Sequence, residues 1–228
     1  MRVRQLTPNL IQLTRLRFVN AYLVREDDGF TLVDTTLPRG AGALVDAAAK
    51  AGAPIKRVAL THGHGDHVGS LDELHPRLDG GVEVSMPEPD ARIHAGEAVV
   101  EGKLPGSWPT VKTRPDVLLQ PGDRVGSLEV VAAPGHTPGH VAFLDHRDRS
   151  LIAGDVFTTI GGAAVTSHFT FPFPLAAMAT WNKQLNLESA RSLQALEPRL
   201  LAVGHGSALQ DPAAETARAI ARAHRALC

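Results

Sequence analysis

The segment LTHGHGDHVGS, residues 60–70, places three histidines and one aspartate within six positions. These residues are His62, His64, Asp66 and His67. So many titratable groups are not buried together without compensation, so they lie in water or bind a cation. The apolar stretch before them, residues 55–60, predicts a strand that ends at the cluster. Alternate residues of an extended chain share a side, so we expect His62 and His64 to point the same way.

Three further segments have the same form, in which an apolar strand is followed by a glycine and a potential metal ligand. They are VVAAPGHTPGH (130–140) with His136 and His140, SLIAGDVF (150–157) with Asp155, and LLAVGHG (200–206) with His205. Each alone is a weak signal, because a Gly-Asp pair after a strand is usually a turn. Imidazole and carboxylate groups are good zinc ligands, and strand ends meet at a common rim. Together the segments predict a metal centre.

The order of predicted elements favours two packed sheets. Strands are expected in residues 11–35, with a hairpin turn at 26–29, and a helix over 40–52. A short helix follows over 67–78, and residues 88–115 are expected to be irregular. Strands and turns fill 117–152, a long helix covers 175–196, and a last helix starts with Asp211 as its cap and Pro212 at its first position. Strands with helices after them in each half predict two sheets with helices outside.

The chain resembles the metallo-β-lactamase superfamily of metallohydrolases. The motifs THGHGDH (61–67), GHTPGH (135–140), AGD (153–155) and GHG (204–206) occur in the family order, and Asp34 in TLVDT (31–35) also matches. The resemblance spans roughly residues 10 to 210. It implies a four-layer αββα sandwich of two mixed β-sheets with helices on the outer faces, and a two-metal site at one edge. We expect residues 1–228 to form one such domain.

The resemblance also assigns roles to individual residues. It implies that His62, His64 and His136 bind one metal ion, that Asp66, His67 and His205 bind the other, and that Asp155 bridges both. Asp34 and His140 are expected to orient these ligands. The expected cofactor is a pair of Zn²⁺ ions, with iron or manganese as alternatives. Asp66 and Asp155 are the candidate catalytic groups, because either could move a proton.

The segment from Val156 to Asn182 follows Asp155 and contains no Lys, Arg, Asp or Glu. It holds His168 and several large apolar residues, in a chain that is only 4% aromatic. We interpret it as an apolar wall of the substrate pocket, closed on the opposite side by Trp108. The expected pocket residues are Trp108, Phe157, His168, Phe169, Phe171 and Phe173. The alternatives are that this run is core, or that it is the interface of a homodimer.

The most favoured activity is hydrolysis of an ester-like carbonyl bond, in a thioester, lactone or ester, by attack of a metal-bound hydroxide. A hydroxyacylglutathione hydrolase would need cationic residues that this wall lacks. An acyl-homoserine lactonase commonly has a tyrosine where this chain has Thr158. The main alternative is an oxidoreductase similar to the persulfide dioxygenases, with one iron. A binding protein that keeps the fold without catalysis is a third class.

Composition limits the partners and the location. The formal charge of −1 and the absence of a Lys/Arg run argue against a nucleic-acid partner. The sequence contains no stretch of 18 apolar residues, so no membrane span is expected, and the first residues do not resemble a signal peptide. Cys228 is the only cysteine, so no disulfide forms within the chain. We expect a cytoplasmic enzyme acting on a small-molecule substrate. His75, His94, His146 and His224 are expected at the surface.

Overall fold

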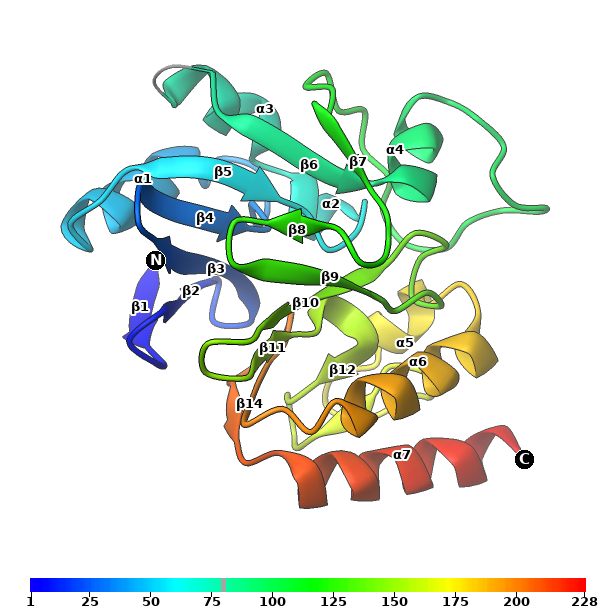
Figure 1. Cartoon of the computed structure of the whole chain (residues 1–228). Helices are drawn as coiled ribbons and strands as arrows, with labels where there is room; N and C mark the ends of the chain where they lie inside the picture. Colours follow the sequence, from blue (N-terminus) through cyan, green and yellow to red (C-terminus); the bar gives the residue numbers. More distant parts are fainter. Residues whose placement is uncertain (79–80) are drawn as a thin grey trace.

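A computed structural model describes residues 1–78 and 81–228 of the chain. In these residues two large β-sheets pack face to face (Figure 1). The first sheet has seven strands in chain order: β1 (Arg2–Gln5), β2 (Leu10–Arg15), β3 (Val19–Glu26), β4 (Gly29–Val33), β5 (Ile55–Ala59), β6 (Glu83–Pro87) and β7 (Val117–Leu119). Strands β1 to β4 are antiparallel and β4 to β7 are parallel, so this sheet is mixed.

The second sheet is also mixed. Its order is β15 (Leu209–Gln210), β14 (Leu200–Ala202), β11 (Ser150–Ile152), β10 (Val141–Asp145), β9 (Leu128–Ala132) and β8 (Arg124–Val125). Only the β11–β14 pair in it is parallel. A small hairpin, β12 (Phe157–Thr158) with β13 (Ala164–Val165), follows β11.

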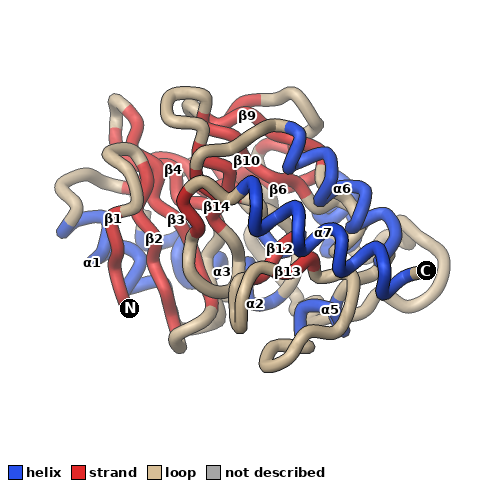
Figure 2. The backbone as a smooth tube through the Cα atoms, turned by 90° about the horizontal axis from the view of Figure 1, so that it is seen from below, coloured by secondary structure: helices blue, strands red, loops and turns tan. Residues whose placement is uncertain are grey.

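Helices cover the outer face of each sheet. The first sheet carries α1 (Ala41–Lys50), α2 (Gly65–Val68), α3 (Leu71–Leu74), the 3₁₀ turn η1 (His75–Arg77) and α4 (Glu88–His94). The second carries α5 (Leu175–Ala179), α6 (Lys183–Ala195) and α7 (Ala213–Leu227), and the turn η2 (Gly154–Val156) precedes β12. Figure 2 shows α6 and α7 running side by side.

Three apolar clusters hold these layers together. Val33 and Ala59 of the first sheet join Phe143 and Ile152 of the second in the cluster between the sheets. A second cluster lies under α1 and α3, and a third lies under α6 and α7. Burial of apolar surface stabilises a fold by roughly 25 cal/mol per Å². The αββα architecture expected from the sequence is therefore confirmed.

The predicted hairpin at residues 26–29 is confirmed, since Glu26 pairs with Gly29 across a two-residue turn. The expectation of an irregular segment over 88–115 was wrong at its start, because α4 occupies Glu88–His94. Pro at the second position and acidic residues in the first turn favour this helix, and both were visible in the sequence.

The long helix expected over 175–196 is two helices. Thr180 leaves the helical conformation, and Asn182 begins α6 by accepting a hydrogen bond from the Leu185 amide. The helix expected over 67–78 is likewise divided into α2, α3 and η1. The last helix begins at Ala213 after Pro212, without a side-chain cap from Asp211, which has a positive φ of 46°. Among the described residues, no helix is both long enough and apolar enough to cross a membrane.

Candidate metal centre

Strand ends deliver the predicted ligands to one edge of the sandwich. The loop after β5 carries His62 and His64, and α2 carries Asp66 and His67. His136 lies in the turn between β9 and β10. Asp155 lies in η2 directly after β11, and His205 follows β14. Because β11 and β14 are adjacent and parallel, their last residues bring Asp155 and His205 to the same place.

The seven side chains converge in three overlapping groups. The groups are His62–His64–His136, His62–His67–Asp155 and Asp66–His67–His205, and within each group the ligand atoms lie within 4.8 Å of one another. The first and third groups are the two ligand sets that the resemblance implies. Asp155 lies between them, because its Oδ2 is 3.4 Å from His136 Nε2 and 3.1 Å from His205 Nε2. A carboxylate in this position could contribute to holding a cation in either group.

Several of these atoms have no partner within the described part of the chain. His62 Nε2, His67 Nε2 and Asp155 Oδ1 are buried and make no hydrogen bond. Buried polar atoms normally have a partner, so convergent orphan atoms of ligand type indicate an ion. The donor set contains imidazole nitrogens and carboxylate oxygens without sulfur, which suits zinc, iron or manganese. The residues therefore fit a pair of divalent cations.

The electrostatics of the cluster also favour added positive charge. Burial opposes protonation of His67, but attraction to Asp34, Asp155 and Asp66 outweighs it and raises the pKa of His67 well above its usual value. Burial likewise opposes protonation of His205, while Asp155 and Asp66 raise its pKa to about 9. Without metal, protons on these two imidazoles offset the carboxylates. A metal ion would take the place of those protons.

Another set of side chains holds the ligands in orientation. Asp34 Oδ2 lies 2.8 Å from His67 Nδ1, and Asp34 also accepts hydrogen bonds from the amide and hydroxyl of Thr61. Thr180 Oγ1 lies 3.0 Å from His136 Nδ1. His140 Nε2 is not available to bind a metal ion, because it accepts a hydrogen bond from the backbone amide of Asp155 at 3.0 Å. Asp34 and His140 thus contact cluster residues from behind, and their role in orienting metal ligands stays a prediction.

Two glycines allow the backbone to approach the cluster closely. A Cβ atom on Gly204 would lie 1.9 Å from Asp155 Oδ1, and one on Gly106 would lie 2.4 Å from His64 Nε2. Gly106 also has a φ of +82°, which side-chain-bearing residues rarely adopt. These positions exclude any side chain because the ligands themselves fill the space.

Asp90 is a functional candidate that the sequence analysis missed. Its side chain is fully buried on α4 and accepts hydrogen bonds from Gly63 N at 2.8 Å, Thr137 Oγ1 at 2.7 Å and Gly139 N at 2.7 Å. Gly63 lies between two ligands, and Thr137 directly follows His136. Burial raises the pKa of Asp90 to about 6, against the lowering effect of these hydrogen bonds. Asp90 therefore joins the two ligand loops. The only signal for Asp90 in the sequence was an acidic residue in the first turn of a helix that follows a strand.

The aromatic residues expected in one pocket wall lie in different places. Trp108 packs against His64 with ring centroids 5.0 Å apart, and Phe173 lies 5.0 Å from the His205 ring. Phe157 is buried in the core under α6 and α7, so its assignment to the pocket wall was wrong. Phe169 and Phe171 are exposed, at 62% and 92%. The β12–β13 hairpin reverses the chain after Asp155 and separates these side chains.

The remaining predicted pocket residue, His168, lies with Phe171 in a separate pocket described below. The prediction that His94 is a surface residue was wrong. It is half-buried, and its Nε2 lies 2.8 Å from the Gly63 carbonyl oxygen. Its ring also packs on Trp108, with centroids 5.5 Å apart. His94 thus supports the ligand loop from α4.

An open pocket of about 570 Å³ lies beside the cluster. Asp66 is the cluster residue that lines it, and 31% of the Asp66 side chain is exposed. The other walls are mostly apolar and include Leu37, Pro38, Pro109, Leu175 and Met178. Leu175 and Met178 project from α5 and are 57% and 60% exposed. The cluster therefore opens toward an apolar cleft rather than a charged one.

Comparison with known proteins identifies the family of the chain. Residues 14–205 match the sequence pattern of the Metallo-beta-lactamase superfamily. The chain belongs to the metallo-β-lactamase superfamily. It is 40% identical to the uncharacterized protein YobT of Bacillus subtilis (strain 168) over 213 residues, which cover 91% of each chain. It is 30% identical to the probable metallo-hydrolase YflN of the same organism, covering 86% of this chain and 81% of the relative.

Other relatives within the superfamily match more distantly. The hydroxyacylglutathione hydrolase GloC of Haemophilus influenzae is 32% identical, over 45% of this chain and 50% of the relative. A metallo-beta-lactamase from Pontibacter korlensis shares the fold with a TM-score of 0.73 and 17% identity, covering 98% of both chains. TTHA1623, solved in a di-iron-bound form, has a TM-score of 0.66 and 26% identity, covering 89% of this chain and 94% of that one.

Proposed function

We propose that this superfamily member hydrolyses an ester-like carbonyl bond, in a thioester, lactone or ester, of a small molecule with an apolar portion. The observation that carries the proposal is the position of Asp66, at which a buried ligand cluster meets a cleft with apolar walls. Two divalent cations in the cluster would lower the pKa of a bound water molecule and polarise the substrate carbonyl. We propose zinc, and the di-iron form of TTHA1623 makes iron the alternative.

The protein's own residues hold the reactants in place. His62, His64 and His136 would hold one cation, and Asp66, His67 and His205 the other, with Asp155 between them. Asp66 faces the cleft, and although burial opposes its ionisation, His67 and His205 keep its pKa well below the usual range. Its carboxylate is therefore ionised, as a group that binds a cation must be. Asp155 is buried among imidazoles, which suits holding charge rather than exchanging protons with substrate.

The cleft walls suit an acyl chain. Leu175 and Met178 expose apolar side chains to solvent, and Pro38 and Pro109 line the same cleft. Burial of one methylene group is worth about 0.8 kcal/mol, which corresponds to roughly a fourfold change in kcat/KM. We expect kcat/KM to rise by about this factor for each of the first few methylenes added to the acyl group.

The test is a hydrolysis panel of p-nitrophenyl esters, lactones and acyl thioesters of increasing chain length, run with and without chelator. Met178→Gln should flatten the chain-length gradient while leaving the rate with an acetyl ester unchanged. Leu118→Gln is the matched control, since Leu118 is 48% exposed on β7 and does not line the cleft. Hydrolysis that persists after metal removal would contradict the proposal. Metal analysis that finds one iron, with oxygen uptake on a persulfide, would assign the oxidoreductase alternative instead.

A further inference from the structure

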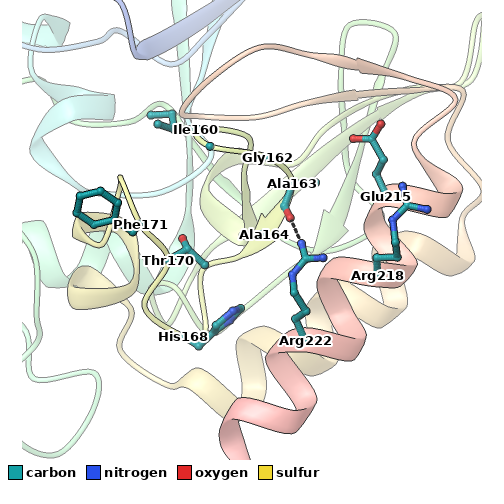
Figure 3. A pocket seen from close by; sticks show the side chains of 11 residues that line it. Ile160, Gly162, Ala163, Ala164, His168, Thr170, Phe171, Glu215, Arg218 and Arg222 are labelled. Atoms are coloured by element: carbon teal, nitrogen blue, oxygen red, sulfur yellow. Dashed lines mark hydrogen bonds between the residues drawn. The ribbon is translucent and has the colours of Figure 1, made fainter.

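A second pocket, distinct from the metal centre, lies between α7 and the segment of residues 160–171. Its volume is about 550 Å³, and none of the seven cluster side chains lines it (Figure 3). Figure 3 shows two unlike walls. Arg218 and Arg222 project from α7 on one side, and Ile160 and Phe171 lie on the other. The pocket is therefore cationic on one wall and apolar on the opposite one.

The cationic wall carries net positive charge. Arg218 and Arg222 lie one turn apart on α7, and Glu215 is the acidic residue that lines the pocket, so the wall has a net charge of +1 (two positive, one negative). Among the described residues, neither guanidinium group forms an ion pair with a carboxylate within 4.0 Å. Arg222 donates a hydrogen bond to the Ala163 carbonyl oxygen, which fixes its side chain across the pocket. Arg218 makes no side-chain hydrogen bond or ion pair within the described part of the chain, so its donors can serve a ligand.

The apolar wall is exposed to an unusual degree. Phe171 is 92% exposed, the largest exposed fraction among the large apolar side chains of the described residues. The backbone next to Phe171 is closely packed, because a Cβ atom on Gly161 would lie 2.5 Å from Pro172 Cδ. An exposed aromatic side chain facing a cationic wall suits a ligand that is amphipathic itself.

We propose that this pocket binds a small amphipathic organic anion. The oxyanion group, a phosphate or a carboxylate, lies against Arg218 and Arg222, whose planar guanidinium groups match such oxygens. The apolar part of the ligand covers Ile160 and Phe171. This site goes beyond the hydrolytic function, and its test does not depend on catalysis.

The test is calorimetric titration of the metal-loaded protein with inorganic phosphate, hexyl phosphate and hexanoate at low ionic strength. Hexyl phosphate should bind more tightly than inorganic phosphate. Arg218→Gln should weaken both by roughly tenfold, since a hydrogen bond to a charged group is removed. Phe171→Ser should remove the advantage of hexyl phosphate and leave inorganic phosphate unchanged. Tighter binding of hexanoate than of hexyl phosphate would assign a carboxylate as the oxyanion.

Arg225→Gln is the matched control, because Arg225 is exposed on the same helix and does not line the pocket. It should bind all three probes like the unaltered protein. Phosphate bound at the metal centre would be insensitive to Arg218→Gln. Equal affinities in the Arg218→Gln and Arg225→Gln variants, or no binding of hexyl phosphate to the unaltered protein, would overturn the proposal. Both arginines are exposed, so neither variant is expected to unfold.

Discussion

Replacing Asp90 by asparagine should weaken metal binding without touching any ligand. The carboxylate accepts three hydrogen bonds, two at Oδ2 from Gly63 N and Thr137 Oγ1, and one at Oδ1 from Gly139 N. Asparagine keeps one acceptor oxygen and puts an NH₂ group in place of the other. With the oxygen at the Oδ2 position, the amide of Gly139 faces a donor and loses its partner.

The magnitude follows from that lost partner. A buried donor left without an acceptor destabilises a protein by about 1–3 kcal/mol, so we expect Asp90→Asn to lower the free energy of unfolding by about 2 kcal/mol. Gly63 lies between His62 and His64, and Thr137 adjoins His136, so the two loops that carry one ligand group lose their common anchor. Changes in groups that orient ligands lower metal affinity by about 10- to 100-fold. We expect a loss of that size here.

The assay is competition for Zn²⁺ between the protein and a chromophoric chelator, together with thermal unfolding. Asp116→Asn is the control, because Asp116 also accepts a backbone hydrogen bond, from Val84 N at 2.9 Å, and makes no hydrogen bond to a ligand loop among the residues that the structure describes. The control should lose stability and keep its zinc affinity. The reasoning is refuted if Asp90→Asn loses stability by the expected amount and binds zinc as tightly as the unaltered protein.

Three further predictions concern other parts of the structure. Gly204→Ala should abolish metal binding at the position of Asp155, because the added Cβ atom would overlap Asp155 Oδ1. Gly42→Ala, whose added Cβ atom has no neighbour within 4 Å in the described part of the chain, should leave the metal content unchanged, and elemental analysis of the two variants checks both expectations. Rebinding of metal near neutral pH should release protons, because the raised pKa values of His67 and His205 leave both imidazoles protonated without metal. Calorimetric titration in buffers of different ionisation enthalpy measures this release, and binding heats that do not depend on the buffer would contradict the prediction. Tyr22 is the only tyrosine, and burial raises its pKa far above the usual value. The stability that comes from keeping its phenol neutral is therefore present below about pH 10 and is lost as the pH rises further. Tyrosinate absorbance should appear only together with unfolding.

The convergence of the seven cluster residues was predictable from the sequence because their positions follow from local rules. Each one follows an apolar strand, all but His67 lie next to a glycine, and the ends of adjacent strands meet at one edge of a sheet. The β11–β14 pairing that brings Asp155 to His205 is an instance of this rule. The αββα layering was predictable for a similar reason, since strands and helices occur in the order that two covered sheets require.

Asp90 was not predictable in this way, because its partners are distant in the sequence. Gly63 is 27 residues away and Thr137 is 47 residues away, and no local pattern relates them. The helix break at Thr180 has the same origin. Residues 175–196 have a continuous helical pattern, but after Thr180 the amides of Trp181 and Asn182 donate hydrogen bonds to the carbonyl oxygens of His136 and Gly135 instead of continuing α5. In both cases a contact with a ligand loop outweighs local preference.

The aromatic segment was misassigned in part, at Phe157, because the composition of a segment does not show which way each side chain points. A run without charged residues indicates burial or a pocket, but the β12–β13 hairpin turns the chain within it. Phe157 consequently enters the core, Phe173 reaches His205, and Phe171 faces the second pocket. A turn of this kind depends on tertiary pairing, which the composition of one segment does not determine.

Asp34 and Asp90, two buried carboxylates that lie behind the cluster, act on it by different means. Asp34 contacts a ligand directly, through His67 Nδ1 at 2.8 Å, so its negative charge makes that imidazole a stronger base and a stronger metal donor. Asp90 touches no ligand side chain, and its hydrogen bonds end on backbone amides and on Thr137. Loss of charge at Asp34 therefore changes the electronic properties of one ligand, whereas loss of charge at Asp90 changes the separation of two loops. The first change should alter proton release on metal binding, and the second should alter metal affinity with proton release unchanged.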